Sequence, residues 1–220
     1  MDKLKEEKVL KYYILCNRLK NIVRTGWKDW NVKRDRIESV AEHIFGVQML
    51  AIAMQSEYQY NIDLEKVIFM LAIHELEEII IGDLTLFQIS KEEKEVLGHN
   101  AIKKVLNSLL AKEEIEKLIV EFDARKTPEA KFAYQCDKLE CDTQCKLYDE
   151  EKCVDLNNQA NNVSFKDEKV QKLLQKESSW SNMWITFGQE RYNYDKNFCA
   201  VSNFVKNNNL NKITSENNIS

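Results

Sequence analysis

The chain has 220 residues, of which 44% are hydrophobic and 31% charged, a mixture that supports a packed core under a solvated surface and excludes a disordered chain. Only five glycines and one proline are available for tight turns, so an all-β sandwich or barrel is nearly excluded. The 32 basic and 36 acidic residues give a net charge of -4, which disfavours non-specific binding to nucleic acid.

No apolar run approaches the ~18–20 residues that span a bilayer, and Met1–Lys5 is charged rather than typical of a signal peptide. We therefore expect a cytoplasmic protein with no membrane or nucleic-acid partner. The six cysteines, at positions 16, 136, 141, 145, 153 and 199, match no zinc or iron–sulfur spacing. They are expected to be reduced residues of the core rather than a disulfide framework.

Apolar residues at helical spacing dominate the chain and predict an all-α fold. The expected helices cover residues 3–22, 38–57, 64–81, 90–111, 112–123, 128–150, 166–187 and 192–206. Asp63 is a plausible cap of the third helix, and Thr127-Pro128-Glu129 is a clear helix start. Residues 25–37, with two tryptophans and several basic residues, are expected to form an ordered irregular segment. We predict one domain over residues 1–206 and a polar, disordered tail over residues 207–220.

Histidine is scarce in this chain, and two of the three histidines lie in informative settings. His43 lies within the second expected helix and His74 near the end of the third. In a continuous helix, Glu75 and Glu78 would lie on neighbouring parts of one face with His74. For any one histidine a hydrogen-bonded structural role is the commoner explanation, and for Glu77-Glu78 a solvated acidic turn. Acids near a helix C-terminus nevertheless oppose the macrodipole and favour electropositive neighbours.

Asp137 adds a third position to this pattern. It follows Ala130 and Ala133 on one face of the sixth expected helix, where small side chains allow another helix to approach and a carboxylate needs a partner. Imidazole and carboxylate groups together suit a divalent ion such as Mn, Fe, Co, Zn or Mg. The doublet at 74–75 also begins the HExxH motif of zinc proteases, but Glu78 replaces the second histidine, so that class is rejected.

The order of these residues resembles the H…HD…D pattern of HD-domain metal-dependent phosphohydrolases. Over about residues 10–150 the motifs resemble the YfbR-like 5'-deoxynucleotidases, most of all the branch that includes the eukaryotic HD-domain-containing protein 2. The motifs are Leu19-Lys20 with Arg24-Thr25-Gly26-Trp27, Ser39-Val40-Ala41-Glu42-His43, His74-Glu75-Leu76-Glu77-Glu78-Ile79-Ile80-Ile81-Gly82-Asp83, Lys91-Glu92-Glu93-Lys94, and Pro128-Glu129-Ala130-Lys131 with Asp137-Lys138-Leu139-Glu140.

The resemblance implies an all-α HD-domain helical bundle that forms a homodimer and holds one divalent metal ion (Mn, Co, Mg, Fe or Zn) per site. The implied metal ligands are His43, His74, Glu75 and Asp137. Arg24 is implied to bind the substrate phosphate and Glu78 to position or deprotonate the attacking water, roles that suit their charge and acid–base chemistry. Asp83 matches the family acid that contacts the sugar, and Trp27 is expected to help wall the nucleotide pocket.

The chain departs from the family at the doublet, which is His-Asp in the family and His74-Glu75 here. Glutamate is one methylene longer, and small misplacements are costly at a catalytic centre. His99 matches no family ligand, and we expect it to be a surface or helix-face histidine.

The sequence thus predicts a metal-dependent phosphomonoester hydrolase, a 5'-nucleotidase acting on (deoxy)nucleoside 5'-monophosphates. Two alternatives stay open. One is an HD phosphohydrolase that acts on another nucleotide phosphoester, and the other is a degenerate nucleotide-binding module in which Glu75 marks lost turnover. The identity of the metal and the preferred sugar and base are open as well.

Overall fold

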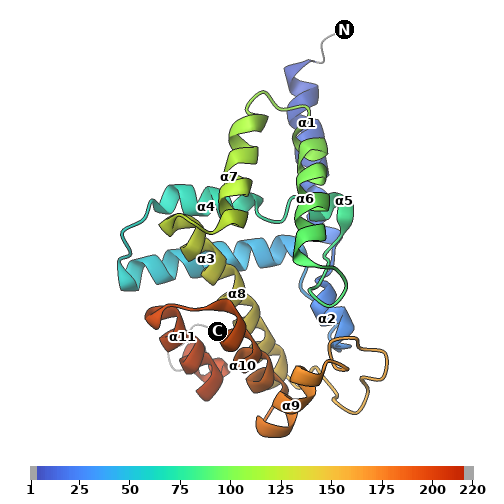
Figure 1. The fold of residues 1–220 in the computed structure, drawn as a ribbon, viewed down its shortest axis with the longest axis vertical. Coiled ribbons are helices and arrows are strands. Elements are labelled where there is room, and N and C mark those ends of the chain that lie inside the picture. The colour runs from blue at the N-terminus through green and yellow to red at the C-terminus, as the bar shows by residue number, and fades with distance from the viewer. Residues whose placement is uncertain (1–3, 216–220) are drawn as a thin grey trace. The chain divides into compact units, whose positions relative to one another are not determined.

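The computed structural model describes residues 4–215, and every regular element in that range is a helix (Figure 1). The elements are α1 (Lys5–Cys16), η1 (Asn17–Asn21, a 3₁₀ helix), α2 (Thr25–Asp29), α3 (Val40–Tyr58), α4 (Leu64–Ile73), α5 (Glu78–Ile81), α6 (Lys91–Leu106), α7 (Lys112–Ala124), α8 (Pro128–Glu150), α9 (Glu168–Lys176), α10 (Trp180–Tyr192), α11 (Lys196–Asn207) and α12 (Leu210–Ser215). The all-α prediction is confirmed. None of the helices in this range is long and apolar enough to cross a membrane.

Helix starts with a clear cap agree best with the predictions. Ser39 accepts a hydrogen bond from the backbone N–H of Glu42, and the Glu42 carboxylate accepts one from the Ser39 N–H, which fixes the start of α3. Asp63 caps α4 by accepting from the N–H of Lys66. The helix predicted over residues 128–150 has those bounds.

Several predicted helices are wrong in their extent, because the chain breaks them. The first becomes 3₁₀ after Cys16, the fourth ends at Leu106, and the helix predicted over 166–187 divides at Lys176. Ser179 explains the new start that follows, because its side chain accepts from the N–H of Asn182. Residues 25–29, expected to be irregular, form α2, and residues 210–215 of the expected tail are helical. Residues 216–220 lie outside the described part.

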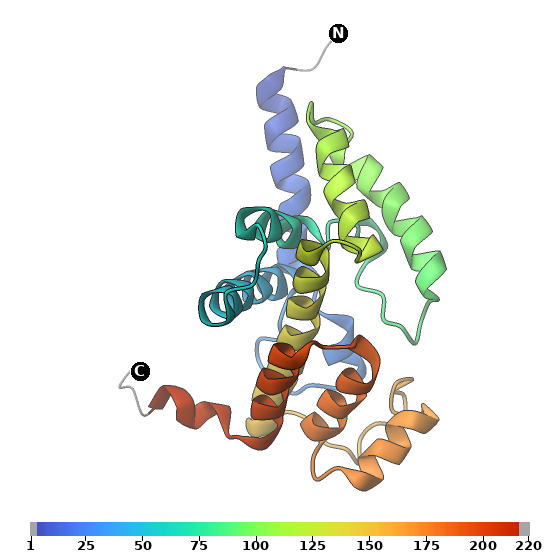
Figure 2. The same cartoon turned by 60° about the vertical axis from the view of Figure 1, so that its left-hand side comes forward.

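The described chain separates into two compact units. The first runs through Thr25 and again from Glu38 to Tyr134, and the second takes Gly26–Ile37 and the residues from Gln135 onward. In the first unit α3 lies beside α4, and α6 lies beside both α5 and α7 (Figures 1 and 2). Because compact units are not by themselves a count of domains, a single domain over residues 1–206 stays a prediction.

The core of the first unit joins the elements that carry the candidate site. Its buried residues come from η1, the start of α3, the end of α4, the turn that follows α4, α6 and α7: Leu19, Val40, Ile73, Leu76, Ile102, Leu106, Ile115 and Ile119. Val40 and Ile73 flank His43 and His74 in the sequence, so burial of these apolar residues fixes the backbone at both histidines.

The second unit is built around tryptophans. Trp27 is 2% exposed, and its ring lies 5.3 Å from that of Tyr148, 5.1 Å from that of Trp184 and 6.3 Å from that of Trp180. This aromatic packing makes Trp27 a core residue of the second unit. Its predicted role in the wall of the nucleotide pocket stays a prediction.

Asp142 is a fully buried carboxyl group in the second unit. The Tyr194 hydroxyl donates to its Oδ2 at 2.9 Å, and Gly188 lets α10 approach it, since a Cβ there would lie 3.0 Å from Oδ1. Burial raises the pKa of Asp142 well above its usual range, against the opposing effects of the Tyr194 hydrogen bond and the Lys138 charge.

All six cysteines are free, as expected. Burial raises the pKa of Cys136 and of Cys145 well above the ordinary thiol value, which suits inert core residues.

Candidate metal centre

His43 is held by the capped start of α3. Its N–H donates to the Ser39 carbonyl at 3.0 Å, so the capping box fixes its place in the helix. The side chain is fully buried. A buried imidazole whose backbone is fixed in this way is well suited to serve as a rigid ligand.

His74 and Glu75 lie just past the end of α4, not inside a longer helix as predicted. α4 ends at Ile73, and the next residues form a tight turn in which the N–H of Leu76 donates to the Ile73 carbonyl. His74 Nδ1 lies 2.7 Å from the Leu71 carbonyl oxygen. Because a carbonyl can only accept, Nδ1 carries the proton and Nε2 keeps the lone pair that a metal needs.

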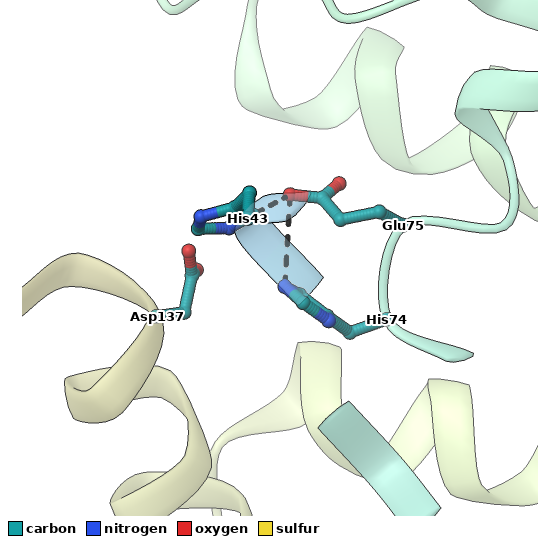
Figure 3. Close-up of side chains that lie close together, drawn as sticks. All are labelled: His43, His74, Glu75 and Asp137. Carbon is teal, nitrogen blue, oxygen red and sulfur yellow. Dashed lines mark ion pairs between the residues drawn. The ribbon is translucent and has the colours of Figure 1, made fainter. Parts of the chain in front are cut away.

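The two histidines and Glu75 converge on one point (Figure 3). Glu75 Oε1 lies 3.8 Å from His43 Nε2 and 3.7 Å from His74 Nε2, and all three residues are buried. Nitrogen and oxygen atoms that share one tetrahedral ion are separated by roughly 3.4 Å, given metal–ligand bonds of about 2.1 Å. The donor set and its spacing therefore fit a divalent metal ion after small movements.

Asp137 lies on α8, which runs unbroken from the first unit into the second. Ala130 and Ala133 are fully buried in the first-unit part of this helix, and Asp137 follows them by seven and four residues, on the same face. Its Oδ2 forms a 2.7 Å ion pair with the neighbouring Lys138. Its role as a metal ligand is part of the proposal below.

Arg24 lies beside the donor cluster, in the extended segment before α2. The backbone N–H of Arg24 donates to the Glu38 carbonyl at 3.0 Å. Its Nη1 is 3.4 Å from Glu75 Oε1 and 3.8 Å from Asp83 Oδ1, while Asp83 Oδ2 accepts a 2.6 Å hydrogen bond from the Thr25 N–H. The structure thus brings together three of the predicted residues: a guanidinium, a metal-donor carboxylate and the predicted sugar-contacting acid.

Glu78 begins α5 and is 1% exposed. Burial raises the pKa of Glu78 well above its usual range, and the charges of Glu75 and Asp83 act in the same direction. Arg24 and Lys94 oppose this rise, and Lys94 Nζ lies 3.6 Å from Glu78 Oε1. A carboxylate whose pKa is raised is a stronger base than an ordinary carboxylate.

Lys94 was given no role by the sequence analysis, although its motif was noted. The available signal was the acidic run after His74, which favoured electropositive neighbours. Lys94 and Arg24 are such neighbours. His99, in contrast, pairs with Asp123: its Nε2 lies 2.8 Å from the Asp123 Oδ2, between α6 and α7.

Comparison with known proteins shows the family of this chain. A family model described as an HD domain matches residues 16–180. The chain belongs to the HD-domain family. The 5'-deoxynucleotidase hdd1 of Schizosaccharomyces pombe is 30% identical over 156 residues, covering 68% of this chain and 76% of that protein. The 5'-deoxynucleotidase HDDC2 of Dictyostelium discoideum is 33% identical over 150 residues, covering 64% of this chain and 78% of that protein.

The fold of this chain also occurs in a solved structure. The PH0347 protein from Pyrococcus horikoshii superposes with a TM-score of 0.66, covering 90% of this chain and 98% of that one at 23% identity. At this identity the likeness shows a shared fold. Together with the family match, it confirms the HD-domain prediction.

Proposed function

We propose that this HD-domain protein is a metal-dependent 5'-nucleotidase that releases phosphate from (deoxy)nucleoside 5'-monophosphates. One observation carries the proposal. The Arg24 guanidinium lies 3.4 Å from Glu75, a member of a buried His–His–Glu donor cluster. A cation beside metal donors suits a phosphoryl group, whose oxygens need positive charge on more than one side. The relatives named 5'-deoxynucleotidase favour a nucleotide as the bearer of that phosphate.

His43, His74, Glu75 and Asp137 would hold the metal ion. Asp137 is supported by the family resemblance and by its place on the same face of α8 as two buried alanines. A bound divalent ion would polarise a phosphoryl oxygen and acidify a water molecule. The set of two imidazoles and two carboxylates is compatible with Mn, Co, Mg, Fe or Zn, and the choice among them is left to experiment.

Arg24 would bind the phosphate, because a guanidinium can donate two parallel hydrogen bonds to its oxygens. Asp83 holds Arg24 and the Thr25 N–H, so it fixes the direction of that guanidinium and is proposed to contact the sugar. Glu78 would orient the attacking water and accept its proton. Its buried setting suits this role, because burial raises the pKa of Glu78 and so makes its carboxylate a stronger base.

The family resemblance supports a homodimer, which we include in the proposal together with the cytoplasmic location expected from the sequence. Neither property enters the chemistry above.

The first experiment is to measure phosphate release from a panel of deoxyribonucleoside and ribonucleoside 5'-monophosphates. Each reaction is run with Mn, Co, Mg or EDTA, and the purified protein is analysed for metals. Metal-dependent release supports the proposal and ranks the sugars. Stoichiometric metal without release would direct the search to another nucleotide phosphoester, and absence of both would favour the degenerate binding module.

Asp137→Ala tests the fourth ligand, with Asp155→Ala as the control at an exposed aspartate. We expect the first variant to lose its metal and its activity and the second to keep both. Full metal content in Asp137→Ala would show that Asp137 is not a ligand.

A further inference from the structure

Lys94 is a charged residue beside Glu78 to which the proposed reaction gives no role. Its Nζ lies 3.6 Å from Glu78 Oε1 and donates a 3.2 Å hydrogen bond to the carbonyl oxygen of Leu84. Leu84 directly follows Asp83. One ammonium group therefore connects the proposed proton acceptor to the turn that carries the proposed sugar-contacting acid.

The local fold of α6 places this ammonium. Ser90 and Glu93 form a capping box that fixes the first turn of α6, and the Lys94 N–H donates to the Ser90 carbonyl at 3.0 Å. Gly98 lies one turn later on the same face, where a Cβ would be 3.4 Å from the Glu77 Cγ. The absent side chain at position 98 thus lets α6 approach the turn before α5 closely, which brings Lys94 within reach of Glu78.

The carboxylates around Lys94 favour the charged form of its side chain. Burial alone would lower the pKa of Lys94, but four neighbouring carboxylates raise it above its ordinary value. These are Glu75, Glu78, Glu77 and Asp83. The ammonium therefore stays charged, although its side chain is only 30% exposed.

We propose that Lys94 is a positioning residue, whose ammonium holds the Glu78 carboxylate and the Asp83–Leu84 turn in one fixed arrangement. This inference rests on the role given to Glu78 in the proposed function. In this proposal Lys94 does not contact the substrate. A purely structural role would lower stability and leave the catalytic constants of the folded protein unchanged.

The test compares three variants. Lys94→Met removes the charge and keeps most of the stem, Lys94→Arg keeps a cation with similar reach, and Lys91→Met is the control at an exposed lysine on the preceding turn of α6. Their kcat and KM are measured with a deoxyribonucleoside 5'-monophosphate that the wild type hydrolyses. Melting temperatures are recorded alongside.

We expect Lys94→Met to lower kcat by about 10- to 100-fold, part of the 10²–10⁴-fold that a positioned base contributes. The change in KM should be smaller. Lys94→Arg should recover most of the lost kcat, and Lys91→Met should match the wild type. A Lys94→Met enzyme with wild-type kcat would overturn the proposal, as would an equal loss in Lys94→Arg.

A second measurement does not depend on turnover. The turn after α5 has backbone N–H groups that make hydrogen bonds: Gly82 to the Glu78 carbonyl, Thr85 to the Gln88 side chain and Gln88 to the Thr85 carbonyl. Hydrogen exchange at these three amides should become faster in Lys94→Met and stay unchanged in Lys91→Met. Unchanged exchange in Lys94→Met would refute the anchoring of the turn.

The two measurements separate the two hypotheses. If the wild type releases no phosphate from any nucleotide, the proposed function fails, while the exchange rates still decide whether Lys94 anchors the turn. If Lys94→Met does not fold, Lys94→Gln replaces it, because the amide removes the charge but remains polar.

Discussion

Replacement of Arg24 by methionine gives the most direct test of how this site binds phosphate. Methionine keeps an unbranched stem of similar volume and removes the guanidinium. Hydrogen bonds to charged groups contribute about 1.5–3 kcal/mol each, so loss of one such bond to the phosphate should lower kcat/KM about 10- to 150-fold. Phosphate release is measured over a range of nucleotide concentrations at saturating metal.

The metal content of Arg24→Met should not fall. Arg24 Nη1 lies 3.4 Å from Glu75 Oε1, so its positive charge competes with a metal ion for that carboxylate, and its removal should leave metal affinity equal or higher. Elemental analysis and chelator competition measure this. Arg18→Met, at an exposed arginine in the preceding 3₁₀ segment, is the control and should behave as the wild type.

Two results would refute the reasoning about Arg24. Loss of metal in Arg24→Met would show that the residue supports the donor cluster rather than the substrate. An unchanged kcat/KM would show that the guanidinium does not bind phosphate at all. Arg24→Lys should fall between the wild type and methionine, because lysine keeps the charge without the planar fork.

Three further predictions concern other residues. Glu75→Asp should lower metal affinity at least about tenfold in chelator competition, because the carboxylate withdraws by one methylene from both imidazoles, and a rise in affinity would contradict this. Gly98→Ala should keep kcat, whereas Gly98→Leu should lower it by pushing α6 away from Glu77. Asp142→Asn should raise the unfolding free energy at pH 8, measured by denaturant titration with Asp35→Asn as an exposed control.

The pH dependence of the Asp142 prediction follows from the direction of its pKa shift. Burial raises the pKa in the folded state, so the folded protein binds this proton more tightly than the unfolded chain does. The contribution of Asp142 to the stability of the wild type should therefore fall as the pH rises above about 4, the ordinary aspartate value. The advantage of Asp142→Asn should grow with pH over the same range, and an advantage that is equal at pH 4 and pH 8 would contradict the explanation.

Local signals predicted the helices well where the sequence carries a cap. The helix starts predicted at Asp63 and at Thr127-Pro128 coincide with the observed starts of α4 and α8. The end of α4 at Ile73 could not be predicted locally, because no glycine or proline follows it closely in the sequence. It depends on packing of the apolar residues on either side, Ile73 and Leu76, in the core of the first unit. Such tertiary contacts override local helix propensity and cannot be predicted from a short stretch of sequence.

The residues of the site were recognisable by order, but their geometry was not. The helical spacing argument placed His74, Glu75 and Glu78 on one face of a continuous helix. In the structure a turn separates the end of α4 from α5, and Glu75 reaches both histidines from that turn. The motif that contains Trp27 was recognised in the sequence, but the burial of its ring in the core of the second unit could not be predicted from that motif.

The charge around Glu78 links the metal site to the cations beside it. Near this residue the described part of the first unit holds the carboxylates of Glu75, Glu77, Glu78 and Asp83 together with the cations of Arg24 and Lys94. Four negative and two positive charges leave a formal charge of -2 if every group is ionised. Buried carboxylates are stable only when opposing charge or a proton compensates them. A divalent ion on the Glu75 donor cluster would supply the two missing positive charges and would favour the ionised form of Glu78, as its proposed role requires.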